Sequence, residues 1–311
     1  MGVAGGDEAG PGPLGALANL AAALAGAHDQ DAVLVALRDR LAAVLGVADA
    51  TVAVIARGAA LDAGGATATA ARSGEVTLGD HAASDGTIGA VALPLSDAKG
   101  QVVSVVTLSS PEARHLDGST RAAARVAFEL GCNAMRHLSI VVRAARMAAL
   151  AGHLSGAVTT TDVARVLRDH GAAPVGATLA SVRLVSAETG TLEGLVVATS
   201  LDPAMVERYV AVELDAPFPI SHAVRTDESV WLPDLDEYAA RFPEAAVDAR
   251  AAGFAASAAV PIHDGAGAVI GVLAVAWTDP VRLDELVRAA VLTIADLVAQ
   301  SLERARLTDA N

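Results

Sequence analysis

Apolar residues recur at every second position in short segments such as 180–186, where Val182 and Leu184 flank Arg183. This is the period of a β-strand with one buried face. Strands are predicted at 50–56, 89–95, 102–109, 180–186, 229–232, 256–262 and 269–277. Apolar residues three to four positions apart predict helices instead. Helices are predicted at 31–45, 116–150, 161–173, 202–210, 220–225, 234–253 and 283–306.

Local signals mark the ends of several predicted helices. Three threonines at 159–161 offer hydroxyl groups that can accept from the first free amides of the helix at 161–173. Asp234 can cap the helix at 234–253 in the same way, and Pro243 breaks or kinks that helix. The start of each of these helices is therefore fixed by side chains close to it in sequence.

Two predicted hairpins share one turn pattern. The five-residue turns at 96–100 and 263–267 each carry Asp at the second position and Gly at the fifth. An Asp side chain can accept hydrogen bonds from the backbone of its own turn, and Gly can adopt a positive φ angle. This spacing therefore favours a tight turn between two strands.

The sequence repeats itself once. Residues 20–55 and 150–185 align without a gap at a shift of 130, and 14 of 36 positions are identical. Residues 91–134 and 258–301 align at a shift of 167, with 12 of 44 positions identical. The second copy therefore carries 37 extra residues between its first strand and its hairpin.

Two copies of so long a unit indicate tandem domains rather than a solenoid, which needs three or more short repeats. The length of 311 residues also suits two domains. We expect a disordered tail at 1–13, a first domain at 14–139, a connecting helix at 140–154 and a second domain at 155–311.

Two segments of the second copy resemble the GAF domain family. Residues 258–273 (AAVPIHDGAGAVIGVL) are similar to its signature hairpin, and residues 220–232 (ISHAVRTDESVWL) are similar to the helix and strand that precede its variable helix. The resemblance covers about 155–305 closely. The first copy matches only through its first helix, hairpin and last helix, and it lacks the family's middle helices.

The resemblance implies an α+β fold of two GAF-like domains. Each domain would be an antiparallel sheet of about six strands with helices packed on it, and a long helix would join the two. The resemblance also implies a signalling or ligand-sensing role and dimerisation through the terminal helices.

Composition excludes several classes of function. The net charge is −14, so the chain has no electrostatic basis for binding nucleic acid or an anionic membrane. No segment is apolar enough for a membrane span, and acidic Asp7 and Glu8 stand where a signal peptide is basic. We therefore expect a cytoplasmic protein, and abundant Ala and Arg indicate a GC-rich bacterial genome.

Catalytic and metal chemistry finds little support. A single cysteine, Cys132, excludes a two-thiol cycle such as that of the GAF-type methionine sulfoxide reductases. Histidines are not paired at helical metal-ligand spacing, so no metal site and no cofactor are expected; haem on a single residue, His222, stays open as a weaker alternative. Asp234, Asp236 and Glu237 are better explained by helix capping than by acid–base catalysis. The run GGDEA at 5–9 resembles a cyclic-dinucleotide synthase signature, but it lies outside any predicted domain.

A small-molecule pocket is predicted in the second domain, between the sheet and the extra helices. Most of the few aromatic residues fall there, and apolar walls with a few polar groups are typical of such sites. The alternative is that these rings fill an ordinary core. Candidate ligand-binding residues are Arg183, His222, Arg225, Trp231, Tyr238, Phe242, Phe254 and Ser257, with Ser181 beside them.

Both long helices carry apolar residues at alternating spacings of three and four, which fit a coiled-coil seam. Packing onto the domain's own sheet uses similar spacing. The residues predicted to form a homodimer interface are Phe128, Met135, Leu138, Val142, Leu283, Val287, Ile294 and Leu297.

The sequence thus predicts a non-enzymatic sensor. Its second domain would bind a small molecule and bias a helical dimer interface. The alternative is an interaction scaffold with degenerate GAF domains, which regulates a separate output protein, such as a kinase, phosphatase or transcription regulator, without binding a ligand.

Overall fold

A computed structural model describes residues 13–47, 49–83, 86–96, 101–115, 117–194 and 209–309. The fold divides into two compact units, Met1–Val141 and Val142–Asn311, which are described separately below. The tail expected at 1–13 and the GGDEA run lie outside the described residues, apart from Pro13.

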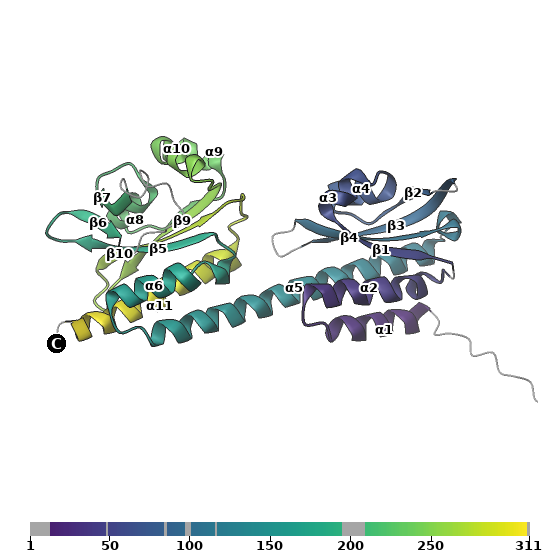
Figure 1. Cartoon of the computed structure of the whole chain (residues 1–311), viewed down its shortest axis with the longest axis horizontal. Coiled ribbons are helices and arrows are strands. Elements are labelled where there is room, and N and C mark those ends of the chain that lie inside the picture. Colours follow the sequence, from purple (N-terminus) through teal and green to yellow (C-terminus); the bar gives the residue numbers. More distant parts are fainter. Residues whose placement is uncertain are drawn as a thin grey trace, which may run out of the picture. The chain divides into compact units, whose positions relative to one another are not determined.

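The first unit is a four-stranded antiparallel sheet with helices on both faces (Figure 1). Its helices are α1 (Pro13–Ala25), α2 (Gln30–Leu45), α3 (Arg57–Asp62), α4 (Gly65–Ser73), the 3-10 helix η1 (Pro111–His115) and the start of α5 (Gly118–Ser155). Its strands are β1 (Thr51–Ala56), β2 (Thr77–Ala83), β3 (Gly86–Ser96) and β4 (Val102–Ser110). The strand order is β1-β4-β3-β2, so β1 and β2 are the two edges.

Two expectations for this unit are corrected. Among its described residues the sheet has four strands rather than about six. Two short helices, α3 and α4, also lie where no middle helices were predicted. They were missed because their Ala- and Thr-rich sequence carries no clear period; α4 is bounded instead by Gly64 and Gly74, both at positive φ.

The core of the first unit lies between the sheet and α1, α2 and α5. Leu37, Leu41, Leu93 and Leu108 are all fully buried there. On the other face, alanines of α4 such as Ala66 and those of β3 pack closely together.

The second unit is a six-stranded antiparallel sheet, also with helices on both faces. Its helices are α6 (Thr160–His170), the 3-10 helix η2 (Ala173–Val175), α8 (Pro219–Thr226), α9 (Leu235–Arg241), α10 (Pro243–Ala251) and α11 (Glu285–Asp309). Its strands are β5 (Leu179–Ser186), β6 (Thr191–Gly194), β7 (Ala211–Glu213), β8 (Val230–Leu232), β9 (Ala256–His263) and β10 (Val269–Trp277). The order β7-β6-β5-β10-β9-β8 confirms the predicted six strands here.

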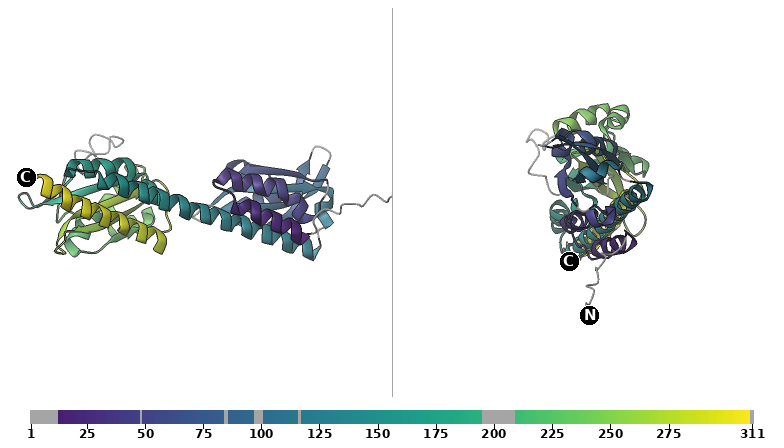
Figure 2. Two further views of the ribbon diagram at one scale, coloured as in Figure 1. Left: turned by 90° about the horizontal axis from the view of Figure 1, so that it is seen from below. Right: turned by 90° about the vertical axis from the view of Figure 1, so that its right-hand side faces the viewer.

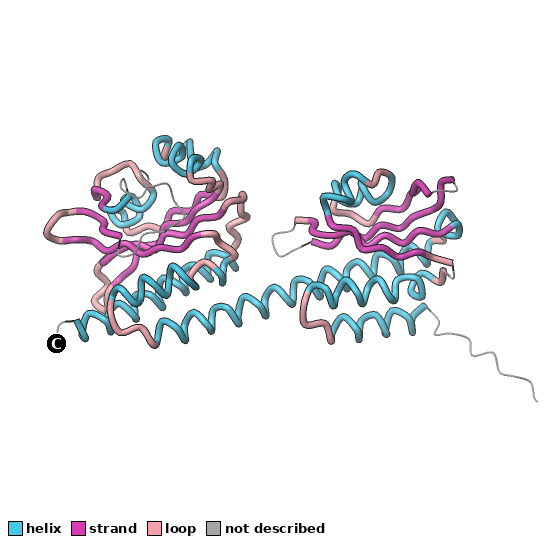
Figure 3. The backbone as a smooth tube through the Cα atoms, viewed as in Figure 1, coloured by secondary structure: helices cyan, strands magenta, loops and turns pink. Residues whose placement is uncertain are grey.

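The helices of the second unit divide between the two faces of the sheet (Figure 3). The view from below shows α6 and the yellow α11 side by side on one face (Figure 2). Val182, Leu273, Val291 and Trp277 are buried in the core beneath them. The indole Nε1 of Trp277 donates to the Val175 carbonyl oxygen at 3.2 Å, which satisfies its buried polar group.

The predicted hairpins pair in the same way in both units. Val91 lies opposite Leu108 on β3 and β4, and Ala258 lies opposite Val275 on β9 and β10, at the predicted shift of 167. In the first strands the pairing corresponds to a shift of 128 rather than 130, so the gapless alignment slips by two residues there. A slip of two keeps every side chain on the same face.

Predicted helix signals act as expected. Thr159 forms a capping box with Asp162, in which each side chain meets the other residue's backbone amide. The side chain of Asp234 accepts from the Glu237 amide, and Pro243 begins a new helix, α10, after α9. Most of the helix predicted at 202–210 lies outside the described residues.

Asp117 and Asp284 hold the starts of the two long helices in the same way. Asp117 accepts from the Thr120 amide at 2.8 Å, and Asp284 accepts from the Val287 amide at 3.0 Å. The hydrogen bond from the Thr120 amide is the main cause that lowers the pKa of Asp117 to about 2.

The predicted dimer seam is wrong for α11. Leu283, Val287 and Ile294 are at most 8% exposed, and Leu297 packs partly buried against the same core. They face the domain's own sheet. A helix that packs on a sheet needs apolar residues at the same spacings of three and four.

The seam on α5 divides. Met135 is buried in the first unit's core, and Phe128 and Leu138 pack against that core. Val142 is 41% exposed, beside the exposed Ile140 and Val141.

Among the described residues, no helix is both long and apolar enough to cross a membrane.

Candidate functional site

The second unit has a hollow on the sheet face opposite α6 and α11. Alternation along the strands places large residues such as Val182 and Leu273 on the α11 face. The opposite face receives small side chains: Ser181 on β5, Ala259 on β9 and Ala274 on β10. Small side chains beneath packed helices leave space, and this is the physical origin of the cavity.

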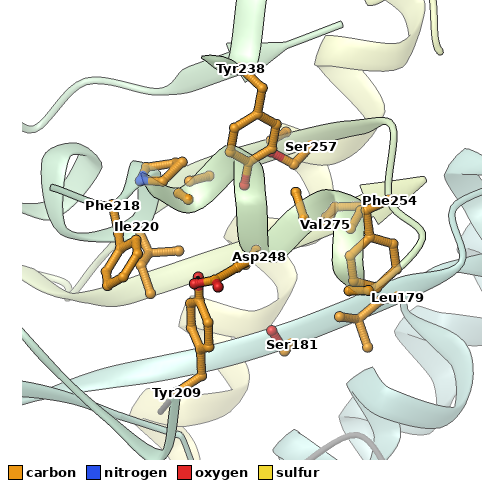
Figure 4. A pocket seen from close by; sticks show the side chains of 18 of the residues that line it. Leu179, Ser181, Tyr209, Phe218, Ile220, Tyr238, Asp248, Phe254, Ser257 and Val275 are labelled. Carbon is orange, nitrogen blue, oxygen red and sulfur yellow. The ribbon is translucent and has the colours of Figure 1, made fainter. Parts of the chain in front are cut away.

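The cavity has a volume of about 130 Å³ and lies between the sheet and α8, α9 and α10 (Figure 4). Its walls are mostly apolar, with a few polar groups. The lining residues are Leu179, Ser181, Arg183, Tyr209, Phe218, Pro219, Ile220, Tyr238, Ala245, Asp248, Ala249, Ala252, Phe254, Ser257, Ala258, Ala259, Ala274, Val275 and Ala276.

Tyr209 and Asp248 form one polar side of the cavity. The Tyr209 hydroxyl donates to Asp248 Oδ2 at 2.9 Å, and Figure 4 shows the two side chains pointing toward each other. The Tyr209 ring also packs at a tilt on Phe218, with 5.2 Å between ring centres. A carboxylate is thus held at the edge of an apolar space by a side chain from a distant part of the chain.

Tyr238 and Ser257 form a second polar pair, on α9 and β9. Burial raises the pKa of Tyr238, while a hydrogen bond with Ser257 acts in the opposite direction. The phenol therefore stays protonated at neutral pH, and its hydroxyl can serve as a hydrogen-bond donor or acceptor.

Arg183 brings a positive charge to the cavity from β5. Its guanidinium donates from Nη1 to the Tyr209 carbonyl oxygen and lies 5.9 Å from the centre of the Tyr209 ring. Burial lowers the pKa of Arg183, but an arginine remains charged in proteins. Gly194 makes room for it, since a Cβ there would lie 3.0 Å from Nη1.

The structure brings half of the predicted ligand-binding residues together. Arg183, Tyr238, Phe254 and Ser257 all line the cavity, as does Ser181. They come from three parts of the chain, and the sheet register joins them.

The other four predicted residues do not line the cavity. His222 stands edge-on to the buried Phe242, with 5.7 Å between ring centres, so these two pack on each other. Arg225 donates to the Leu214 carbonyl oxygen at 2.7 Å. Trp231 is turned toward the α11 face of the sheet, where it packs against the core.

Sequence reasoning missed Tyr209, Asp248 and Phe218. Tyr209 lies in the aromatic-rich region that directed attention to this pocket, so composition could have found it. Asp248 sits in the middle of α10 and looks like a solvent-facing helix residue in sequence. Only its position opposite Tyr209 in the folded chain identifies it as a cavity residue.

The site offers hydrogen bonding rather than evident covalent chemistry. Among the described residues, no cluster of three or more His, Cys, Asp or Glu side chains could hold a metal ion. Cys132 lies on α5 in the first unit, outside the cavity, and burial raises the pKa of its thiol. A cavity of this kind can bind and orient a small molecule.

Comparison with known proteins identifies the second unit. The family model described as "GAF domain" matches residues 157–303. No curated protein matches the chain.

Several solved structures are similar in fold. The GAF domain of an Acinetobacter phosphoenolpyruvate-protein phosphotransferase is 15% identical, with 54% of this chain and 98% of that chain covered and a TM-score of 0.44. The corresponding domain from Coxiella burnetii is 15% identical, with 55% and 98% covered and a TM-score of 0.45. A free methionine-R-sulfoxide reductase from Neisseria meningitidis is 15% identical, with 55% and 92% covered and a TM-score of 0.37. The family match and the six-stranded sheet agree that residues 157–303 of this chain form a GAF domain.

Proposed function

We propose that this protein is a non-enzymatic sensor whose GAF domain binds a small molecule in the cavity between the sheet and α8–α10. GAF domains have signalling or sensing roles in general. The observation that carries the proposal is the cavity itself, with apolar walls and polar groups from Tyr209, Asp248, Tyr238 and Arg183.

The cavity volume limits the size of the ligand. About 130 Å³ is close to the roughly 150 Å³ of an apolar cavity that binds benzene. We therefore propose a ligand with one ring or an equivalent apolar body. It would carry at least one polar group that bonds to the hydroxyl of Tyr238 or Ser257, or to the carboxylate of Asp248.

Ligand binding would act on the helices through the sheet. β10 contributes Ala274 and Ala276 to the cavity, and its Leu273 and Val275 to the core under α11. If a ligand binds one arrangement of these strands better than another, the population of the chain shifts toward the arrangement that it binds better. We propose that the signal passes in this way from the cavity to α11.

The test combines a native mass spectrum with a titration. The purified chain is sprayed without added ligand to detect a bound small molecule, and then titrated with phenol while amide chemical shifts are followed by NMR. We expect either bound mass or saturable shifts around Ser181, Tyr238 and Ser257. Phenol is a suitable probe because it has one ring and one hydroxyl.

A matched pair of variants locates the site. Ala274→Phe fills the cavity, whereas Ala289→Phe adds the same ring at an exposed position of α11. Binding should be lost in the first variant and retained in the second. Equal binding in both variants, or none in the unchanged protein, would contradict the proposal.

We further propose that the first unit is a second, reduced GAF-like domain that binds no ligand. Its hairpin register supports this relationship, because β3 and β4 pair as β9 and β10 do. Buried alanines of α4 lie directly on the corresponding sheet face, where Ala66, Ala70 and Ala92 are at most 3% exposed.

The proposed homodimer would use the exposed residues of α5. Ile140, Val141 and Val142 are 57%, 50% and 41% exposed, whereas the apolar seam of α11 is already covered. The alternative function, an interaction scaffold that regulates a separate output protein, would keep this contact and leave the cavity empty.

A further inference from the structure

The first unit carries an open groove between its edge strand β2 and the outer face of α5. The groove has a volume of about 740 Å³. Its lining includes Val76 just before β2, Leu78 on β2, and Arg121, Arg125, Val126 and Leu130 from α5. Leu78 is 37% exposed and Val126 is 44% exposed, so the floor of the groove is apolar and accessible.

The second unit has an equivalent place. Leu78 pairs with Val91, and Trp231 pairs with Ala258, which stands 167 residues after Val91. Trp231 on β8 therefore corresponds to Leu78 on β2. The same shift of 167 relates Arg288 on α11 to Arg121 on α5.

In the second unit a tryptophan occupies this place. The Arg288 guanidinium lies 5.2 Å from the centre of the Trp231 ring, and the Trp231 side chain packs partly buried against the core. The Val281 amide donates to the Pro233 carbonyl oxygen at 3.0 Å. This bond holds the segment before α11 against the residue that follows β8. The domain's own indole thus covers the space between edge strand and helix.

In the first unit the arginine is present but the indole is missing. Leucine stands in place of tryptophan, which leaves the groove open. Within the described part of the chain, no side-chain hydrogen bond or ion pair engages Arg121 or Arg125. The second unit shows which kind of group fits here, because an aromatic ring beside an arginine gains both apolar contact and a cation–π interaction.

The charges in the groove narrow the choice of partner. Arg121 and Arg125 stand one turn apart on α5, and the single carboxylate among the lining residues is Glu129. The groove is thus locally positive on a chain of net charge −14. An acidic segment would complement it.

We propose that this groove binds a peptide segment of another protein, which inserts one aromatic side chain between Leu78 and Arg121 and places a carboxylate on Arg125. The second unit would not compete for such a segment, because Trp231 fills its own groove and Leu292 replaces the second arginine.

The test uses the full chain and three capped peptides. The probe peptide has the sequence Gly-Asp-Trp-Asp-Gly; in one control peptide Ala replaces Trp, and in another Lys replaces both Asp residues. Methyl NMR spectra are recorded during titration. We expect saturable shifts at the methyl groups of Leu78, Val126 and Leu130 with the probe peptide only, with a Kd of about 1 mM or below.

Variants of the groove make the test specific. Leu78→Trp should fill the groove as in the second unit and weaken binding at least tenfold. Val54→Trp is the matched control, because Val54 is 36% exposed on the opposite edge strand, and it should bind as the unchanged protein does. Arg125→Glu should weaken the binding of the acidic peptide and strengthen the binding of the lysine peptide.

Three results would overturn the proposal. Absence of chemical-shift changes at a peptide concentration fivefold above the expected Kd of about 1 mM would exclude the site. Equal shifts with the alanine peptide would exclude the aromatic anchor. Equal loss of binding in Leu78→Trp and Val54→Trp would place the contact elsewhere.

Discussion

The Tyr209 hydroxyl and the Asp248 carboxylate are 2.9 Å apart, although 39 residues separate them in the chain. This hydrogen bond joins the segment directly before β7 to α10, across one side of the cavity. It fixes the position of a negative charge at the edge of an otherwise apolar space.

Tyr209→Phe removes this bond and leaves the ring in place. Because hydrogen bonds to charged groups are worth about 1.5–3 kcal/mol, we expect the free energy of unfolding to fall by roughly that amount. Urea denaturation measures it. A double-mutant cycle with Asp248→Asn should show strong non-additivity, and simple addition of the two effects would contradict a direct bond.

Gly271→Ala should destabilise the GAF domain. A Cβ at Gly271 would lie 2.3 Å from the Arg183 carbonyl oxygen, and backbone cannot move out of the way as a flexible side chain can. We expect a loss of about 1–3 kcal/mol, measured by thermal and urea unfolding.

The matched control for Gly271→Ala is Gly152→Ala on α5. A Cβ there would have no neighbouring atom within 4 Å. Because alanine is favoured over glycine inside a helix, this variant should be unchanged or more stable by up to about 1 kcal/mol. Similar losses in both variants would show that the tight approach at Gly271 has no effect.

Asp117 makes stability dependent on acid pH. Its pKa in the folded protein is about 2, below the ordinary value of 3.8, mainly because the Thr120 amide donates to it. The carboxylate therefore contributes stability that is present above the ordinary value and is lost as the pH falls through about 2. Titration of the Asp117 carboxyl carbon by NMR should give a midpoint near 2, whereas a midpoint near the ordinary value would contradict the cap geometry.

Ile294→Ala distinguishes a core residue from a dimer contact. Ile294 is fully buried, so its truncation should cost about 2–5 kcal/mol. Leu292→Ala on the same helix, at a side chain that is 43% exposed, should cost little. Size-exclusion chromatography should also give the same oligomeric state for Ile294→Ala as for the unchanged protein, since truncation of a residue in a seam between two chains would weaken the dimer.

Most of the helices and strands, and the ends of several of them, follow from local features of the sequence. The capping box of Thr159, the cap at Asp234 and the break at Pro243 depend on side chains within a few residues of the backbone groups they satisfy. Periodicity also located the paired hairpins, because alternation along a strand is a local property. Short elements without a clear period, such as α3, α4 and β2, were missed for the same reason.

Which residues share a site depends on how the distant parts of the chain pack together. The spacing of Leu283, Val287 and Ile294 suits both a sheet and a second helix, and only packing assigns it to the sheet. Trp231 and Ser257 lie on paired strands, β8 and β9, yet the first faces α11 and the second faces the cavity. The cavity itself arises where small side chains of three separate strands meet under α8–α10, and no local pattern in the chain encodes that meeting.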